Sequence, residues 1–203
     1  MNRRRNPVEH DVIVPVQERW SPYRFDGREV AQDQLNQCLE AARWAASSFN
    51  DQPWSFLIAR RESTSEFESM LGCLLEANQG WASRAGVLIL TCVRTSFEYN
   101  GKPNRVALHD LGQAACQLSL QAASLGLQVH QMAGVNLSLI RQRYSIPDGV
   151  EPQTAIAIGH PDLAEPADEL GQQLAKRETG PRSRKPLAEI CFSRKFGDPA
   201  ELG

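Results

Sequence analysis

Apolar residues recur along the chain with spacings that predict helices and strands in turn. Apolar positions three or four residues apart predict a helix over about residues 33–46 with one apolar face. The same spacing predicts a second helix from about residue 67 to residue 78 and a short helix over 137–144, which Asn136 would cap. The longest predicted helix covers residues 105–125.

Four apolar runs between these helices predict strands. Val87–Val93 is a continuous apolar run, which is typical of a buried central strand. The other runs are Trp54–Arg60, Leu127–Gly134 and Gln153–Gly159. A chain of 203 residues can bury a sizeable core, so we expect these elements to form one domain.

The longest predicted helix carries an apolar seam whose positions alternate between spacings of three and four, as in a coiled coil. The seam consists of Leu108, Leu111, Ala115, Leu118, Ala122 and Leu125. One interpretation is the core helix of a monomer. The other is a helix that packs both in the core and against a second subunit. The seam alone does not decide between them.

The remaining segments are polar and predict little regular structure. We expect residues 1–18 to be loosely held and residues 96–104 to form a loop. Residues 162–181 are charged, contain Pro and Gly, and are predicted to form an extended connector. The connector leads to residues 187–192, whose pattern indicates a strand or a docking segment.

The composition is that of a globular protein, with 41% hydrophobic and 23% charged residues. A net charge of -2 without an obvious dense basic patch argues against nucleic-acid binding. No stretch approaches the length of a membrane span, and no apolar segment follows the basic N-terminus. Scattered cysteines without a C-x-x-C pair predict reduced, buried thiols in a cytoplasmic protein. They are Cys38, Cys73, Cys92, Cys116 and Cys191.

Short polar side chains are concentrated where the first predicted helix gives way to the first predicted strand. They are Ser47, Ser48, Asn50 and Gln52. On a local interpretation, Ser47 and Ser48 cap the helix and Asn50 forms an Asx turn. On a functional interpretation, these hydroxyls and amides are donors that a rigid scaffold aims at a flat heterocyclic ligand.

Common catalytic and nucleotide-binding motifs are absent from the sequence. It contains no Gly-x-Gly, no Gly-x-x-x-x-Gly-Lys, no His-Glu-x-x-His and no Gly-x-Ser-x-Gly. We therefore name no catalytic residue and no metal ligand, and expect His109-Asp110 to have a helix-surface or helix-start role. Guanidinium groups match phosphate oxygens, so a phosphate clamp is predicted from Arg19, Ser21, Arg182 and Arg184. Donors without a nucleophile favour a cofactor that brings its own reactivity.

Five stretches resemble, in order, signatures of the FMN-dependent nitroreductase family. They are Arg19-Trp-Ser-x-x-x-Phe25, Ala41–Trp54, His109–Ala115 with Leu125–Leu127, Gln131–Gly134 with Ile158–Pro161, and Arg182–Pro186. The second stretch is the most specific, because it is similar to the family pattern Ala-Ala-x-x-Ala-Pro-Ser-Ser-x-Asn-x-Gln-Pro-Trp. Together the stretches cover residues 19–192.

The resemblance implies a set of FMN-binding residues. Arg19 and Ser21 would contact the phosphate, ribityl or pyrimidine side of FMN, and Arg182 and Arg184 would complete the phosphate clamp. The Ser-Ser-x-Asn turn would reach FMN from the neighbouring subunit, and a backbone segment would lie near flavin N5. The residues are Arg19, Trp20, Ser21, Tyr23, Ser47, Ser48, Asn50, Gln52, Met132, Ala133, Gly134, Arg182 and Arg184.

This sequence departs from the family pattern at several positions. Ala46 stands where the family usually has Pro, and Trp20 and Tyr23 occupy positions that are often His or basic. A positive charge near the flavin stabilises its anionic reduced form, so Tyr23 bears on the redox potential and not on the fold. Val135-Asn136 replaces a common Phe-Asp pair.

The fold that the resemblance implies is an α+β three-layer sandwich, with a mostly antiparallel central sheet flanked by helices, in an intertwined homodimer. The domain would cover residues 19–203 after a polar segment over 1–18, and residues 162–203 would form a C-terminal arm that docks on the partner subunit.

The activity that the resemblance implies is two-step, ping-pong hydride transfer from NADH or NADPH through flavin N5 to a nitroaromatic, quinone or enone-like acceptor. Three alternatives remain. One is an FMN-binding sensor or scaffold without turnover. Another is a flavin-dependent dehalogenase or dehydrogenase, although residues 96–104 are short for the lid of such enzymes. The third is a helical dimer without a ligand.

Overall fold

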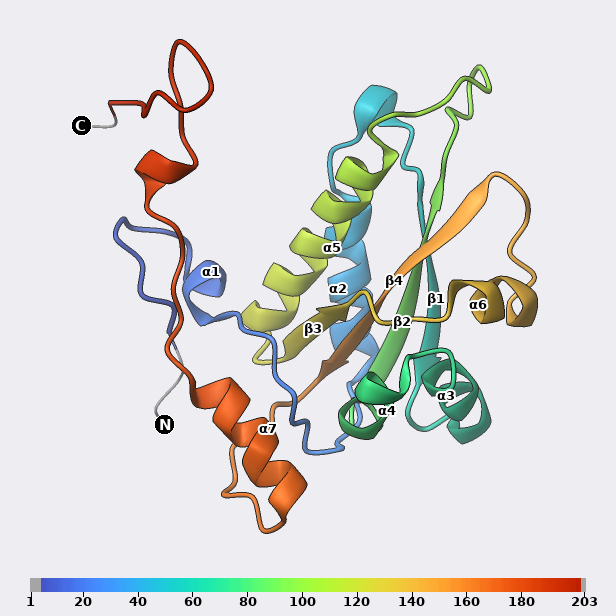
Figure 1. Ribbon diagram of the computed structural model, residues 1–203. Coiled ribbons are helices and arrows are strands. Elements are labelled where there is room, and N and C mark those ends of the chain that lie inside the picture. The colour runs from blue at the N-terminus through green and yellow to red at the C-terminus, as the bar shows by residue number, and fades with distance from the viewer. Residues whose placement is uncertain (1–4, 202–203) are drawn as a thin grey trace.

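A computed structural model describes residues 5–201 as a three-layer arrangement of helices around one sheet (Figure 1). The α-helices are α1 (Val14–Glu18), α2 (Gln32–Arg43), α3 (Thr64–Leu71), α4 (Glu76–Ala82), α5 (Ala107–Ser124), α6 (Leu137–Arg143) and α7 (Glu169–Thr179). Two short 3₁₀ helices are η1 (Ser48–Asn50) and η2 (Leu187–Glu189). None of these helices is both long enough and apolar enough to cross a membrane.

The central sheet has four strands in the order β1-β2-β4-β3, and each neighbouring pair is antiparallel. The strands are β1 (Trp54–Arg60), β2 (Val87–Arg94), β3 (Gln128–Met132) and β4 (Val150–Gly159). The predicted antiparallel α+β sandwich is confirmed.

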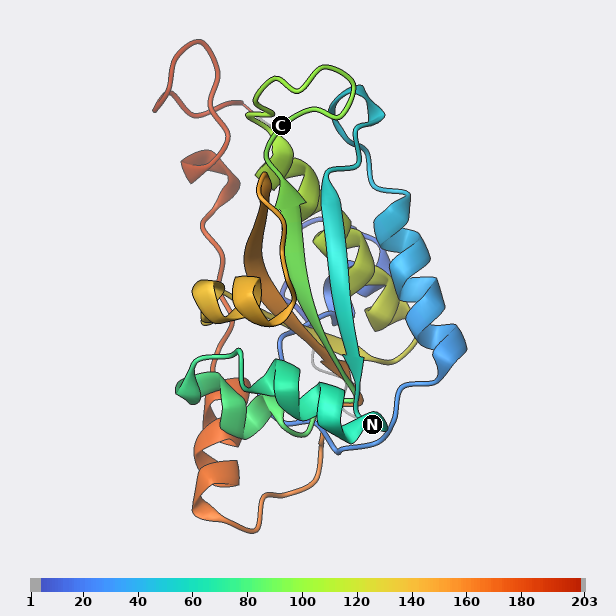
Figure 2. The same cartoon turned by 90° about the vertical axis from the view of Figure 1, so that its right-hand side faces the viewer.

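Two cores lie on opposite faces of the sheet because successive side chains of a strand point to opposite faces. On β2, Val87 and Ile89 pack with residues of α2 and α5, whereas Leu88 and Leu90 pack with residues of α3, α4 and α6. Figure 2 shows α2 and α6 on opposite sides of the sheet. Both faces of β2 are therefore buried, as its continuous apolar run predicted.

The predicted first and second helices differ from the observed ones. α2 ends at Arg43, three residues before the predicted end at Ala46. The predicted second helix is two helices, because a break at residues 72–75 pairs with the segment before α6. Leu74 forms a bridge with Val135, and the Asn136 N–H donates to the Cys73 carbonyl (2.8 Å). The predicted cap of α6 is confirmed, because the Asn136 side chain accepts from the Leu139 N–H.

The seam of α5 is mostly buried. Leu111, Ala115, Leu118 and Ala122 pack in the core, but Leu108 is 59% exposed, so the interpretation as a core helix of a monomer does not account for Leu108. The Asp110 carboxylate is buried in the first turn of α5, which confirms the expected helix-start role of that residue.

The chain ends contain more structure than the sequence predicted. The described part of the N-terminal segment includes α1, which packs beside α5, while residues 1–4 lie outside the described residues. The expected extended connector over 162–181 contains α7. Residues 187–192, predicted to be a strand or a docking segment, begin with η2 and not with a strand. After α7 the chain runs back past α1 and beyond it (Figure 1).

The cysteines are not all buried. Cys38, Cys73 and Cys92 are buried, and burial raises the pKa of the Cys38 thiol to about 12, which keeps it protonated and unreactive. Cys116 is exposed on α5 and Cys191 is half-buried, so the prediction of buried thiols is wrong for these two.

Candidate functional site

Two segments from opposite ends of the chain bring the predicted phosphate-binding residues together. We call Arg19, Ser21, Arg182 and Arg184 the arginine group. Arg19 follows α1, and its backbone N–H closes that helix by donating to the Pro15 carbonyl (2.9 Å). Its guanidinium Nη2 donates to the Ser21 hydroxyl (3.0 Å). Arg182 and Arg184 come from the segment after α7.

The arginine group lines two hollows in the surface. One has a volume of about 210 Å³ and the other about 260 Å³, and Arg19, Arg182 and Arg184 line both. Ser21 lines the larger hollow, and so do Arg177 and Glu178. The sequence prediction that these donors share one place is therefore met by the geometry of the single chain.

The charges of the arginine group are crowded and partly removed from water. Burial lowers the pKa of Arg19 from its ordinary value, and the neighbouring Arg184 lowers it further. Both effects disfavour a charged guanidinium, so a bound anion would offset them. Guanidinium forks and a hydroxyl are donors that suit a phosphate monoester.

Trp20 and Tyr23 take structural positions beside the arginine group. Trp20 is buried, its backbone N–H donates to Gln128 Oε1 (2.9 Å), and the Arg182 guanidinium lies 5.8 Å from its ring centroid. The ring of Tyr23 packs edge-on against His130, with ring centroids 4.7 Å apart. Tyr23 therefore belongs to an aromatic cluster against the sheet.

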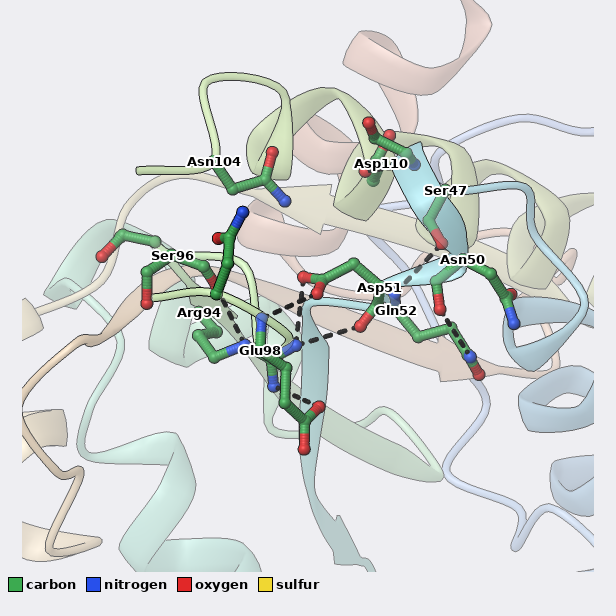
Figure 3. A network of polar contacts seen from close by, with 12 residues as sticks. Ser47, Asn50, Asp51, Gln52, Arg94, Ser96, Glu98, Asn104 and Asp110 are labelled. Carbon is green, nitrogen blue, oxygen red and sulfur yellow. Dashed lines mark hydrogen bonds and ion pairs between the residues drawn. The ribbon is translucent and has the colours of Figure 1, made fainter. Parts of the chain in front are cut away.

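The polar turn between α2 and β1 is held in an unusual backbone conformation. Phe49, Asn50 and Gln52 have φ values of 55°, 54° and 46°, in the left-handed region that non-glycine residues rarely adopt. The Ser47 hydroxyl accepts from the Gln52 N–H (3.0 Å) (Figure 3). The Ser48 N–H donates to Asp110 Oδ2 (3.1 Å). Local strain of this kind is typical of functional sites.

Asp51 anchors this turn, and the sequence analysis did not identify it. Its carboxylate is 2% exposed, pairs with Arg94 Nη2 (3.0 Å) and accepts from the Glu98 N–H (2.9 Å) (Figure 3). Nearby, the Asn104 N–H donates to the Thr95 carbonyl (2.8 Å). The Asn104 side-chain nitrogen is buried without a hydrogen-bond partner in the described part of the chain, so a partner from outside would be favourable.

The predicted backbone contact segment lies at the end of β3. Met132 is buried, and the Gly134 carbonyl accepts from the Leu75 N–H (2.9 Å) and from Asn78 Nδ2 (3.1 Å). A Cβ atom at Gly134 would lie 2.4 Å from Asn78 Nδ2, which explains why a glycine suits this position. Ala133, the residue between them, is exposed.

The predicted FMN residues do not all meet in one chain. The arginine group lies beside α1 and the end of α7, whereas the turn containing η1 lies near the start of α5, at the other end of that helix's length (Figure 1). The structure thus brings together the arginine group and leaves Ser47, Ser48, Asn50 and Gln52 apart from it. Glu178 lies beside the arginine group and was not predicted from the sequence, because the charged segment that contains it carries no motif.

The chain is an α+β sandwich in which arginines from both ends of the sequence line the same surface hollows. A solved structure described as an oxidoreductase containing FMN has the same fold, with a TM-score of 0.86 and 32% identity over 98% of this chain and 99% of that one. An uncharacterized 15.4-kDa protein of the ask 5′ region in Mycolicibacterium smegmatis is 32% identical over 71% of this chain and 98% of its own length.

A shorter match connects the chain with an enzyme of named activity. The major NAD(P)H-flavin oxidoreductase of Aliivibrio fischeri is 33% identical over 60 residues, which are 29% of this chain and 28% of that protein. Residues 16–160 match the sequence profile of the Nitroreductase family. This chain therefore belongs to the nitroreductase family.

Proposed function

We propose that this protein is an FMN-dependent oxidoreductase that uses NADH or NADPH to reduce a small organic acceptor. The observation that carries the proposal is the arginine group, in which Arg19 lines the same hollows as Arg182 and Arg184 from the opposite end of the chain. Membership of the nitroreductase family and the FMN in a structure that is 32% identical support it.

The donor chemistry of the arginine group fits FMN. A phosphate monoester carries two negative charges and accepts bidentate guanidinium bonds, and the crowded charges of Arg19 and Arg184 would be relieved by it. Ser21, already an acceptor for Arg19, has its hydroxyl proton to donate to a phosphate oxygen. Arg182, half-buried over the Trp20 ring, would complete the clamp.

A homodimer would bring the polar turn to the flavin. The turn is rigid in the single chain but lies apart from the arginine group, so Ser47, Ser48 and Asn50 would contact FMN held by the partner subunit. Leu108, exposed on α5 near this turn, would be covered in the same interface, which is the second interpretation of the α5 seam. Burial of such an exposed leucine favours association. In that dimer the chain after residue 184 would extend over the partner.

The chain's own residues would bind and orient the cofactor and the substrates. The chemistry that bound FMN supplies is hydride transfer from NAD(P)H to an acceptor such as a nitroaromatic, a quinone or an enone, in two half-reactions. The rigid backbone at Met132–Gly134 would face the flavin ring, and Asn104 would offer its unpaired nitrogen as a donor. We assign no side chain as an acid or a base.

The visible absorption spectrum of the purified, desalted protein tests the proposal. We expect flavin bands, release of FMN on denaturation, and bleaching of the bands by NADH or NADPH under anaerobic conditions. Restoration of the bands by a quinone would establish turnover. A colourless protein that does not take up added FMN would refute the proposal, and FMN binding without bleaching would leave a flavin-binding protein that is not a reductase.

A further inference from the structure

A fully buried carboxylate lies at the end of α7. The Glu178 side chain is 0% exposed, although its helix lies at the edge of the fold and has no other buried residue. Glutamate is almost never fully buried unless it is paired. Oε1 accepts from the backbone N–H groups of Tyr23 (2.7 Å) and Arg24 (2.8 Å), and Oε2 pairs with Arg24 Nε (3.2 Å).

These bonds join the two halves of the arginine group. Tyr23 and Arg24 lie shortly after Ser21 in the first segment, and Glu178 lies shortly before Arg182 in the second. The segment over residues 19–24 is irregular, so its backbone N–H groups need partners from outside the segment. Glu178 supplies two of them from one oxygen atom.

Electrostatics alone does not explain a carboxylate at this position. Glu178 lines the larger hollow together with the three arginines of the arginine group and with Arg177. A negative charge there repels an anion, so its charge weakens anion binding through space. A benefit to the site therefore has to come from the geometry that the carboxylate imposes.

We propose that Glu178 is a positioning residue that holds the segment after α7 in register with the segment after α1, so that the arginine group is formed before an anion binds. The proposal rests on the proposed function, because the anion is the phosphate of FMN. Two other contacts work in the same direction: Arg182 Nη1 donates to Asn6 Oδ1 (2.5 Å), and the Arg177 guanidinium lies 5.5 Å from the Tyr23 ring centroid.

Substitution of Glu178 by Gln separates geometry from charge. The variant removes the negative charge, which by itself strengthens phosphate binding. It also replaces Oε2, which accepts from Arg24 Nε, by an amide NH₂ group. That hydrogen bond is then lost, and two donors face each other. A positioning role thus predicts weaker FMN binding, and a purely electrostatic role predicts stronger binding.

The readout is the ratio of affinities for FMN and riboflavin, which lacks the phosphate, measured by flavin fluorescence on the full-length apoprotein. For Glu178→Gln we expect this ratio to fall by about tenfold, a loss of about 1.4 kcal/mol confined to the phosphate. A general loosening of the fold would weaken both ligands alike. The matched control is Glu169→Gln, the same charge change at an exposed position of α7, for which we expect an unchanged ratio.

Limited trypsin digestion of the flavin-free protein provides a second readout. Trypsin cuts after Arg182 and Arg184, and cleavage of a segment held in place requires local opening. We expect faster cleavage there in Glu178→Gln than in the wild type or in Glu169→Gln, with the thermal midpoint of each variant recorded alongside. Unchanged cleavage rates would overturn the proposal.

The variants also distinguish the two proposals. If Arg182→Ala lowers the FMN-to-riboflavin ratio but Glu178→Gln leaves it unchanged or raises it, the positioning role is wrong and the proposed function stands. If wild-type protein binds FMN no better than riboflavin and Arg182→Ala changes nothing, the phosphate site is misplaced and both proposals fall.

Discussion

The polar turn and the arginine group are built in opposite ways. The turn over residues 47–52 is one short, continuous segment. Asp51 within the turn, together with Arg94 and Asp110, holds its conformation. The arginine group joins two segments that are far apart in sequence and lie on the surface. A strained turn of this kind needs strong internal anchors, whereas a group of like charges needs a ligand or a counter-charge.

This difference predicts that variants of the two regions fail differently. Disruption of the turn would act mainly on the free energy of unfolding, since its anchors are buried. Disruption of the arginine group would act mainly on ligand affinity, since its side chains lie at the surface and its like charges repel one another. The expected changes in affinity or stability are largest for the arginine group, smaller for the turn and smallest for a buried histidine.

The largest effect is expected for the double variant Arg182→Ala/Arg184→Ala. Two charge-assisted contacts to phosphate are worth about 1.5–3 kcal/mol each, so FMN affinity would fall by roughly 100-fold or more. The thermal midpoint would change much less than the affinity, because Arg184 is exposed and bonds the neighbouring Ser183 carbonyl, while Arg182 gives up its bond to Asn6. Equilibrium flavin titration and thermal unfolding measure the two quantities, and Lys185→Ala is the matched control. An unchanged FMN affinity would mean that the phosphate binds elsewhere.

A smaller effect, of opposite type, is expected for Asp51→Ala. The variant leaves Arg94 and the Glu98 N–H without the carboxylate that they contact, and we expect a loss of about 2–3 kcal/mol in the free energy of unfolding. Arg94 is 28% exposed, so water replaces part of the ion pair. Urea unfolding measures the change.

Two comparisons sharpen the Asp51 prediction. Asp51→Asn keeps one acceptor oxygen and should lose about half as much stability. Asp33→Ala removes an exposed carboxylate on α2 and should lie within about 0.5 kcal/mol of the wild type. Equal losses for Asp51→Ala and Asp33→Ala would show that the turn is not anchored as described.

The smallest effect is expected in the pH dependence of the free energy of unfolding, through a histidine that contacts the segment after Arg19 and Ser21. Burial lowers the pKa of His130, whose Nδ1 contacts the Pro22 carbonyl (2.8 Å) and so ties the segment before Tyr23 to β3. The unfolded chain therefore binds this proton more readily, and the free energy of unfolding falls as the pH drops from about 6.5 through the folded-state pKa.

The variant His130→Gln should flatten part of that pH dependence. Burial also lowers the pKa of His160, which contributes in the same direction, so His160→Gln provides the second half of the comparison. Urea unfolding at pH 7.5 and at lower pH measures the slope. A slope that neither substitution changes would place the responsible group elsewhere.

The sequence predicted the parts of the fold that depend on local pattern. The apolar run of β2 predicted a strand buried on both faces, and the three-and-four spacing predicted α2 and α5. The break between α3 and α4 was not predictable, because it depends on the bridge between Leu74 and Val135. α7 was hidden for another reason: it is mostly polar, and its one buried residue is a glutamate.

The candidate site follows the same division. Motif resemblance predicted Arg19 and Arg182 as neighbours, and the structure places them on the same hollows. Asp51 and Glu178 were missed because nothing in their local sequence distinguishes a buried, paired carboxylate from a solvated one. Their roles depend on contacts across 43 and 155 residues of sequence, respectively.

The bond between Glu178 and Tyr23 also has a consequence for biosynthesis. All four strands and the buried apolar residues of both core layers have been made once residue 159 is reached, and only the partly buried Leu174 is added to the core later. Arg19 and Ser21 are translated early, but Arg182 and Arg184 are made only near the end of translation. On the ribosome the scaffold can therefore precede the proposed phosphate site, and a message truncated after β4 would encode all four strands but neither Arg182 nor Arg184.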